Sequence, residues 1–75
     1  MQQTELYIEA LIFSSEQSIR VEEIIYCLQS VFERDFTRDE VNTCLDHIRE
    51  KYRDERLAIE LVRVANGYQF LTKKE

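Results

Sequence analysis

The side chains most able to do chemistry are one histidine, His47, and two cysteines, Cys27 and Cys44. The cysteines are widely separated and show no Cys-x-x-Cys spacing, so together with a single histidine they do not form a zinc-ligand pattern. Each cysteine lies among apolar residues at helical spacing, which indicates reduced thiols in the core and no disulfide. We therefore expect no metal and no cofactor, and we expect His47 at the surface.

Two pairs of adjacent acids, Glu22-Glu23 and Asp54-Glu55, are the remaining catalytic candidates. Neighbouring residues on a helix point about 100° apart, so neither pair is arranged for general acid-base chemistry. The sequence also has no glycine-rich phosphate loop and no nucleophile elbow. These observations predict that the protein is not an enzyme.

Composition and charge restrict the class of protein. The 75 residues, 44% hydrophobic and 33% charged, are typical of a single globular domain spanning residues 1–75. The net charge of −5 argues against a stand-alone nucleic-acid binder, whose phosphate contacts need basic residues. No apolar run approaches the roughly 20 residues of a membrane span, and no signal peptide is evident, so we expect a cytoplasmic protein.

Helical periodicity predicts three helices before residue 54. The first, residues 4–14, has one apolar stripe formed by Ile8, Leu11 and Ile12. A second apolar set on its opposite side consists of Leu6, Ala10 and Phe13. Only the sector of Glu5 and Glu9 is polar. A helix that is apolar around most of its circumference must be covered on more than one side.

The second helix is expected to begin near Val21 and to leave Tyr26 exposed. Its predicted core arc consists of Val21, Ile24, Leu28 and Val31. A polar connector, residues 33–36, precedes Thr37 and Glu40, whose spacing forms a capping box. The third helix should therefore start at Thr37 and run to about Arg53, with Val41, Leu45 and Ile48 on its buried side.

After the third helix the apolar period changes to two, which is typical of strands. Residues 57–64 and 68–72 flank Asn66-Gly67, a strong β-hairpin signal. A further short strand is expected near Ile19. Helix, short strand, helix, helix and hairpin in this order predict an α+β fold, the winged helix-turn-helix.

The hairpin register decides which side chains remain exposed. A turn at Asn66-Gly67 puts Ile59 and Leu61 on one face with Tyr68 and Phe70. It pairs Val62 with Leu71, Val64 with Gln69 and Glu60 with Lys73 on the other face. One face covers the core, and the other retains apolar side chains for a self-contact, unless a bulge or twist buries both. The predicted dimer or partner interface comprises Tyr7, Tyr26, Val62, Val64 and Leu71.

DNA binding by the third helix is the alternative that the fold invites. The candidate contacts on its solvent face are Arg38, Asn42, Arg49 and Arg53. Three acids, Asp39, Asp46 and Glu50, share that face and balance the three arginines. This balance favours a solvated face and makes direct nucleic-acid binding unexpected, so a winged-helix DNA-binding transcriptional regulator is the second hypothesis.

Three strings resemble a known family. Residues 8–15, Ile-Glu-Ala-Leu-Ile-Phe-Ser-Ser, and residues 21–24, Val-Glu-Glu-Ile, are similar to the opening of segregation and condensation protein B (ScpB). Residues 59–75, which contain Ile-Glu-Leu, Gly-Tyr and Thr-Lys-Lys-Glu, are the more specific match to the same family. Ser18, Arg20 and Asn66 depart from that family's usual proline, small capping residue and glycine.

The resemblance implies the N-terminal half of a longer protein with two winged helices. It also implies a non-enzymatic homodimer joined through this domain. In the complete protein it implies the kleisin ScpA and SMC as partners, on the bacterial nucleoid.

Overall fold

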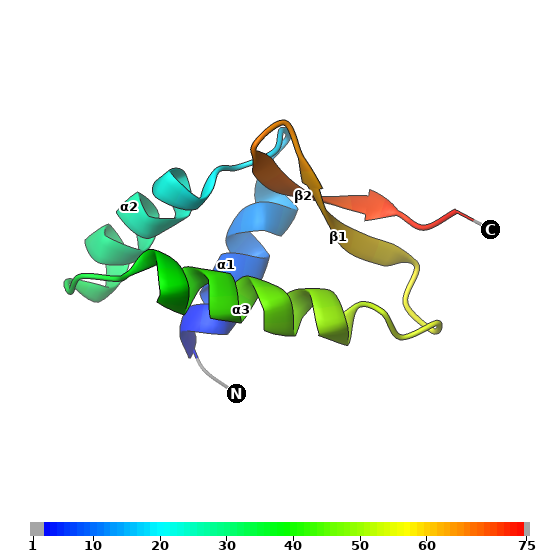
Figure 1. Ribbon diagram of the computed structural model, residues 1–75, viewed down its shortest axis with the longest axis horizontal. Helices are drawn as coiled ribbons and strands as arrows, with labels where there is room; N and C mark the ends of the chain where they lie inside the picture. The colour runs from blue at the N-terminus through cyan, green and yellow to red at the C-terminus, as the bar shows by residue number, and fades with distance from the viewer. Residues whose placement is uncertain (1–2, 75) are drawn as a thin grey trace.

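The computed structural model describes residues 3–74 and contains three helices followed by a β-hairpin (Figure 1). The elements are α1 (Gln3–Ser14), α2 (Val21–Phe32), α3 (Arg38–Lys51), β1 (Ile59–Val64) and β2 (Gly67–Thr72). The predicted α+β winged-helix arrangement is confirmed. The expected end of the third helix at Arg53 is wrong by two residues, because Tyr52 already forms the C-cap. Met1, Gln2 and Glu75, the last residue of the ScpB-like tail, lie outside the described residues.

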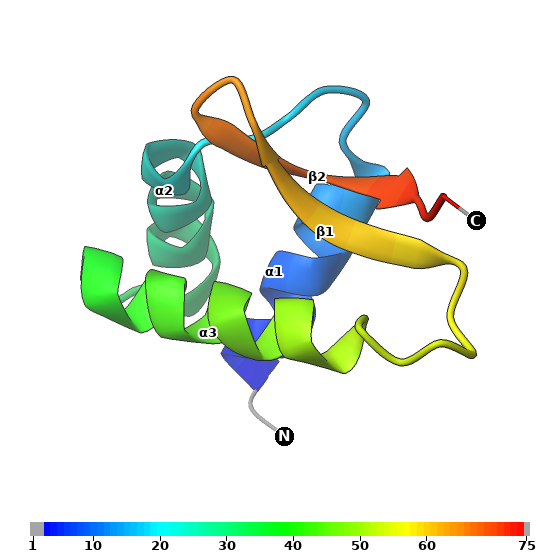
Figure 2. The same ribbon diagram turned by 45° about the vertical axis from the view of Figure 1, so that its right-hand side comes forward.

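The hydrophobic core lies where the three helices meet beneath the hairpin (Figure 2). Its buried side chains are Ile8, Ile12, Ile19, Ile24, Leu28, Phe36, Val41, Leu45, Ile48 and Leu61. The prediction that Val31 belongs to this core is wrong, since its side chain is 52% exposed. Phe32 takes the inward place at the end of α2, with its ring packed edge-on against both Tyr7 and Phe36.

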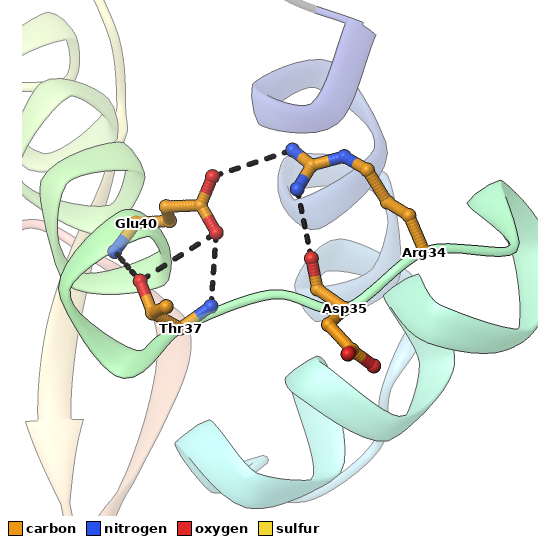
Figure 3. A network of polar contacts seen from close by, with 4 residues as sticks. All are labelled: Arg34, Asp35, Thr37 and Glu40. Atoms are coloured by element: carbon orange, nitrogen blue, oxygen red, sulfur yellow. Dashed lines mark hydrogen bonds and ion pairs between the residues drawn. The ribbon is translucent and has the colours of Figure 1, made fainter.

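The turn between α2 and α3 is held by a compact polar network (Figure 3). Thr37 is the N-cap of α3, as predicted, and its hydroxyl accepts the Glu40 backbone N–H at 3.1 Å. The Glu40 carboxylate accepts the Thr37 backbone N–H at 2.9 Å and also contacts Arg34 at 3.4 Å. One residue of the predicted polar connector belongs to the core. Phe36 is buried, and the Arg34 guanidinium lies 3.8 Å above its ring.

The start of α2 shows how Arg20 replaces a short capping residue. Its side chain has no acceptor atom and caps no backbone N–H of the helix. Glu23 supplies the reciprocal half of a capping box, because its carboxylate accepts the Arg20 backbone N–H at 2.9 Å. The departure at Arg20 therefore leaves the helix start at Val21 unchanged.

The hairpin turn lies one residue earlier than its sequence motif predicts. Ala65 and Asn66 form the turn, and their φ angles of 48° and 69° are both positive, as a type I′ turn requires. Gly67, in contrast, has no positive φ and is the first residue of β2. The prediction of Asn66-Gly67 as the two turn residues is therefore wrong, although the hairpin itself is confirmed.

The change of turn moves every cross-strand pair by two residues along β2. The predicted partners of Glu60, Val62 and Val64 were Lys73, Leu71 and Gln69; the observed partners are Leu71, Gln69 and Gly67. Because side chains alternate with a period of two, this shift leaves each residue on its predicted face. Leu61 is buried on the inner face, and Val62, Val64 and Leu71 share the outer face as expected.

Ile19 adds an isolated β-bridge to the two-stranded sheet where the sequence predicted a short strand. It exchanges two backbone hydrogen bonds of 2.9 and 2.8 Å with Tyr68 of β2. Gly67 is required beside this bridge, because a Cβ there would lie 2.9 Å from the Ile19 carbonyl oxygen. The sheet order is therefore Ile19, β2, β1, with β1 at an edge.

Candidate interaction surface

The outward side of α1 carries a row of exposed apolar side chains. Leu6 is 47% exposed and Phe13 68% exposed, and Ala10 between them is exposed as well. These positions are four and three residues apart and therefore form one stripe along the helix. Phe13 extends the stripe toward the hairpin, where its ring lies 6.0 Å from that of Phe70. The second apolar side that the sequence predicted for this helix is thus only partly covered within residues 3–74.

The outer hairpin face supplies a second apolar area. Leu71 is 43% exposed, and Val62 and Val64 are half-buried without packing against the core. Gln69 lies among them and reaches back to the Glu16 carbonyl at 3.5 Å. The structure thus brings together three of the five residues in the predicted interface.

The two tyrosines of the predicted interface lie elsewhere. Tyr26 is 71% exposed on α2, as expected. Tyr7 is half-buried and packs against the core, with its ring at 87° to that of Phe32 and 5.8 Å away. The Tyr7 side chain therefore packs largely within the domain and offers little surface to a partner. Leu6 and Phe13, which the sequence indicated only as helix-one apolar surface, present more exposed side chain.

Two polar side-chain contacts join α1 to α3. The Glu5 side chain is only 9% exposed, and one of its oxygens lies 3.1 Å from His47 Nδ1. One turn further, Lys51 Nζ lies 3.0 Å from a Glu9 carboxylate oxygen, and this hydrogen bond raises the pKa of Lys51. The sequence contains a signal for these two contacts, because the two acids are four residues apart on the first helix and the two bases are four residues apart on the third. His47 is exposed, as expected, and is a structural partner of Glu5.

Two of the four residues of the DNA alternative are paired with acids, and one of these two, Arg53, lies just beyond the end of α3. Arg38 pairs with Glu22, whose pKa is lowered by a backbone hydrogen bond and by the charge of Arg38. Arg53 lies 3.5 Å from Glu50 on the next turn back. Asn42 and Arg49 are exposed, and among the described residues Arg49 has no ion-pair partner.

The remaining chemical groups do not assemble into a site. Both thiols are half-buried, and burial raises the pKa of Cys44. Within residues 3–74, no three His, Cys, Asp or Glu side chains are close enough to hold a metal ion. Over the same range, none of the three helices has the length and apolar character needed to cross a membrane.

The helix order, the α2–α3 turn and the hairpin with its Ile19 bridge define a winged-helix domain. A family model described as segregation and condensation complex subunit ScpB matches residues 6–75. The chain therefore belongs to the ScpB family. No curated protein matches it significantly.

A solved structure supports the fold. The chain is similar to a conserved hypothetical protein from Chlorobium tepidum, with 29% sequence identity and a TM-score of 0.74. The match covers 96% of this chain and 42% of that one, so this chain spans less than half the length of its structural neighbour.

Proposed function

We propose that this chain is a non-enzymatic interaction domain of the chromosome segregation and condensation machinery and that it forms a homodimer. Membership of a family described as a segregation and condensation complex subunit supports the cellular role. In the complete protein its partners are the kleisin ScpA and SMC, on the nucleoid in the bacterial cytoplasm. Self-contact is supported by one observation above the others, the exposed stripe of Leu6, Ala10 and Phe13 on α1.

The extent of apolar surface supports self-contact through more than one element. A stable interface buries about 800 Å² on each partner, which one side chain cannot supply. The α1 stripe and the outer hairpin face of Val62, Val64 and Leu71 together offer a larger apolar surface. Small monomeric domains rarely leave so much apolar surface without a partner.

Molecular mass measured against concentration tests the proposal. Light scattering of the parent chain should give a mass that rises toward twice 9.1 kDa as concentration increases. Phe13→Glu and Leu71→Glu should each lower the association while leaving the melting temperature almost unchanged. Val31→Glu is the matched control, because Val31 is an apolar residue outside the proposed interface whose exposure, 52%, lies between those of Leu71 and Phe13. A monomer at all concentrations contradicts the homodimer.

DNA binding by α3 is the alternative function and makes an opposite prediction. A DNA-binding regulator would bind duplex DNA with an affinity that falls steeply with salt, and Arg49→Gln would weaken it. The pairing of Arg38 and Arg53 with acids leads us to expect negligible affinity at physiological salt. Fluorescence anisotropy with labelled duplex DNA at two salt concentrations distinguishes the two functions.

A further inference from the structure

The outer edge of β1 carries unpaired backbone groups. In an antiparallel ladder, residues alternate between those that bond to the neighbouring strand and those that point away from it. Tyr68 bonds to Ile19 on the far side of β2, so its N–H and C=O point away from β1. Its cross-strand partner Arg63 must then direct its own N–H and C=O to the free edge.

The alternation extends this edge along β1. Leu61 and Ile59 lie two and four residues from Arg63, so their N–H and C=O groups also point to the free edge. At the start of β1, the hydrogen bond from the Lys73 N–H to the Ala58 carbonyl agrees with this alternation, because Ala58 bonds across the hairpin and Ile59 does not. No backbone hydrogen bond joins Ile59, Leu61 or Arg63 to another element of residues 3–74. Three donors and three acceptors therefore lie in a row, and β1 contains no proline that would block pairing.

A groove lies beside this edge. It occupies about 1120 Å³ between the C-terminal half of α3, the α3–β1 loop and β1. In Figure 2, β1 is the strand on the α3 side of the hairpin. Half-buried Tyr52 and Leu57, together with Ala58 and Leu61, give the groove an apolar part. A strand added to β1 would place alternate side chains there.

The charge of the groove differs from that of the rest of the protein. Five of the ten Lys and Arg residues line it, against four of the fifteen Asp and Glu residues. The groove therefore has a net charge of +1, and the remaining sequence has −6. The five cations are Arg49, Arg53, Arg56, Lys73 and Lys74. Arg53 pairs with Glu50 and Arg56 with Asp54, so within residues 3–74 the groove cations without a carboxylate partner are Arg49, Lys73 and Lys74.

We propose that the free edge of β1 and this groove bind an extended peptide segment of another protein, with carboxylates on the side that faces the groove and apolar side chains on the other side. The segment adds to the sheet as a strand antiparallel or parallel to β1, and its backbone bonds to Ile59, Leu61 and Arg63. Its carboxylates enter the groove and face Arg49, Lys73 and Lys74, and its apolar side chains lie on the outer face beside Val62 and Val64. This site is separate from the α1 part of the self-contact, which lies on the β2 side of the domain, and it adjoins the outer hairpin part at Val62 and Val64.

Nuclear magnetic resonance with the ¹⁵N-labelled chain tests the site. The probe is an acetylated and amidated peptide of about six residues, long enough to span the edge, with alternating valine and glutamate. It should shift the amide signals of Ile59, Leu61 and Arg63 and slow their hydrogen exchange. A peptide of alternating valine and lysine should bind at least severalfold more weakly. Equal binding of the two peptides, or no shift at the three amides, overturns the proposal.

Two matched pairs of variants separate the backbone and charge contributions. Arg63→Pro removes an outward N–H and should weaken binding by up to roughly tenfold relative to Arg63→Ala, which loses the same charge but keeps the N–H. Arg49→Gln should weaken binding, whereas Arg20→Gln, an exposed arginine outside the groove, should not. If Arg49→Gln and Arg20→Gln weaken peptide binding equally, the proposal is overturned. Shifts at the same three amides caused by excess unlabelled chain alone also overturn it, because the edge would then be a self-contact.

Discussion

Gly67→Ala should separate the Ile19 strand from the sheet. The new Cβ would lie 2.9 Å from the Ile19 carbonyl oxygen and 3.0 Å from its carbonyl carbon. Both are backbone atoms, so no side-chain rotation relieves the contact. The substitution therefore acts on the bridge between Ile19 and Tyr68.

The expected loss follows from that bridge. It consists of two backbone hydrogen bonds, and each contributes a net 0.5–1.5 kcal/mol or so to stability. Gly67→Ala should then lower the free energy of unfolding by about 1–3 kcal/mol. For a domain of this size that corresponds to a fall of roughly 5–20 °C in melting temperature.

Thermal unfolding followed by circular dichroism gives the stability, and amide hydrogen exchange locates the change. Exchange should accelerate at the Ile19 and Tyr68 amides before it accelerates in α2 or α3. Thr72→Ala, an exposed substitution in the same strand and away from Ile19, is the control. A Gly67→Ala protein that melts within about 3 °C of the parent and protects both amides equally would refute the steric explanation.

Three further substitutions test other parts of the fold. Ala65→Gly should stabilise the domain by about 0.5–1 kcal/mol, because φ of 48° strains alanine more than glycine; denaturant unfolding that shows a loss would contradict this. Leu28→Ala should cost about 2–5 kcal/mol and Val31→Ala less than about 1 kcal/mol, since only Leu28 is buried; equal losses in urea unfolding would count against the observed core. A backbone hydrogen bond from Thr37, assisted by Arg34, lowers the pKa of Glu40, so its contribution to stability is present above pH 4.5 and is lost as pH falls through the lower folded pKa. Glu40→Gln should therefore flatten this part of the acid-unfolding curve, and an unchanged curve would show that Glu40 does not contribute.

The sequence was most informative where a short pattern has one physical solution. Thr37 and Glu40 form a capping box whose two hydrogen bonds are local, and the structure contains both. The faces of the hairpin were also predictable, because residue alternation determines them even when the turn is displaced. The position of the turn was not predictable from the sequence. Asn-Gly fits a type I′ turn well, but the observed turn places Ala65 at positive φ, and a tertiary contact offsets the cost of that conformation. That contact is the approach of Gly67 to Ile19, which no local pattern contains.

Burial depended on partners that are distant in sequence. Val31 has the same helical phase as the core residues of α2, yet the neighbouring Phe32 is the residue that packs inward, against Tyr7 and Phe36. Phe36 follows charged residues and still becomes buried, because α2 and α3 close over it. Glu5 belonged to the polar sector of the first helix and is nevertheless among the least exposed charged groups, because α3 places His47 beside it.

The Ile19 strand also bears on how the domain forms during synthesis. Its hydrogen-bond partner, Tyr68, lies 49 residues further along the chain. The three helices and their packing can form from residues 3–51, but this part of the sheet cannot close until the last strand has left the ribosome. Contacts of such long sequence separation form late and slow folding. A nascent chain halted before Gly67 would therefore expose the apolar helix surfaces that the hairpin covers, and these surfaces would be open to chaperones or to wrong partners.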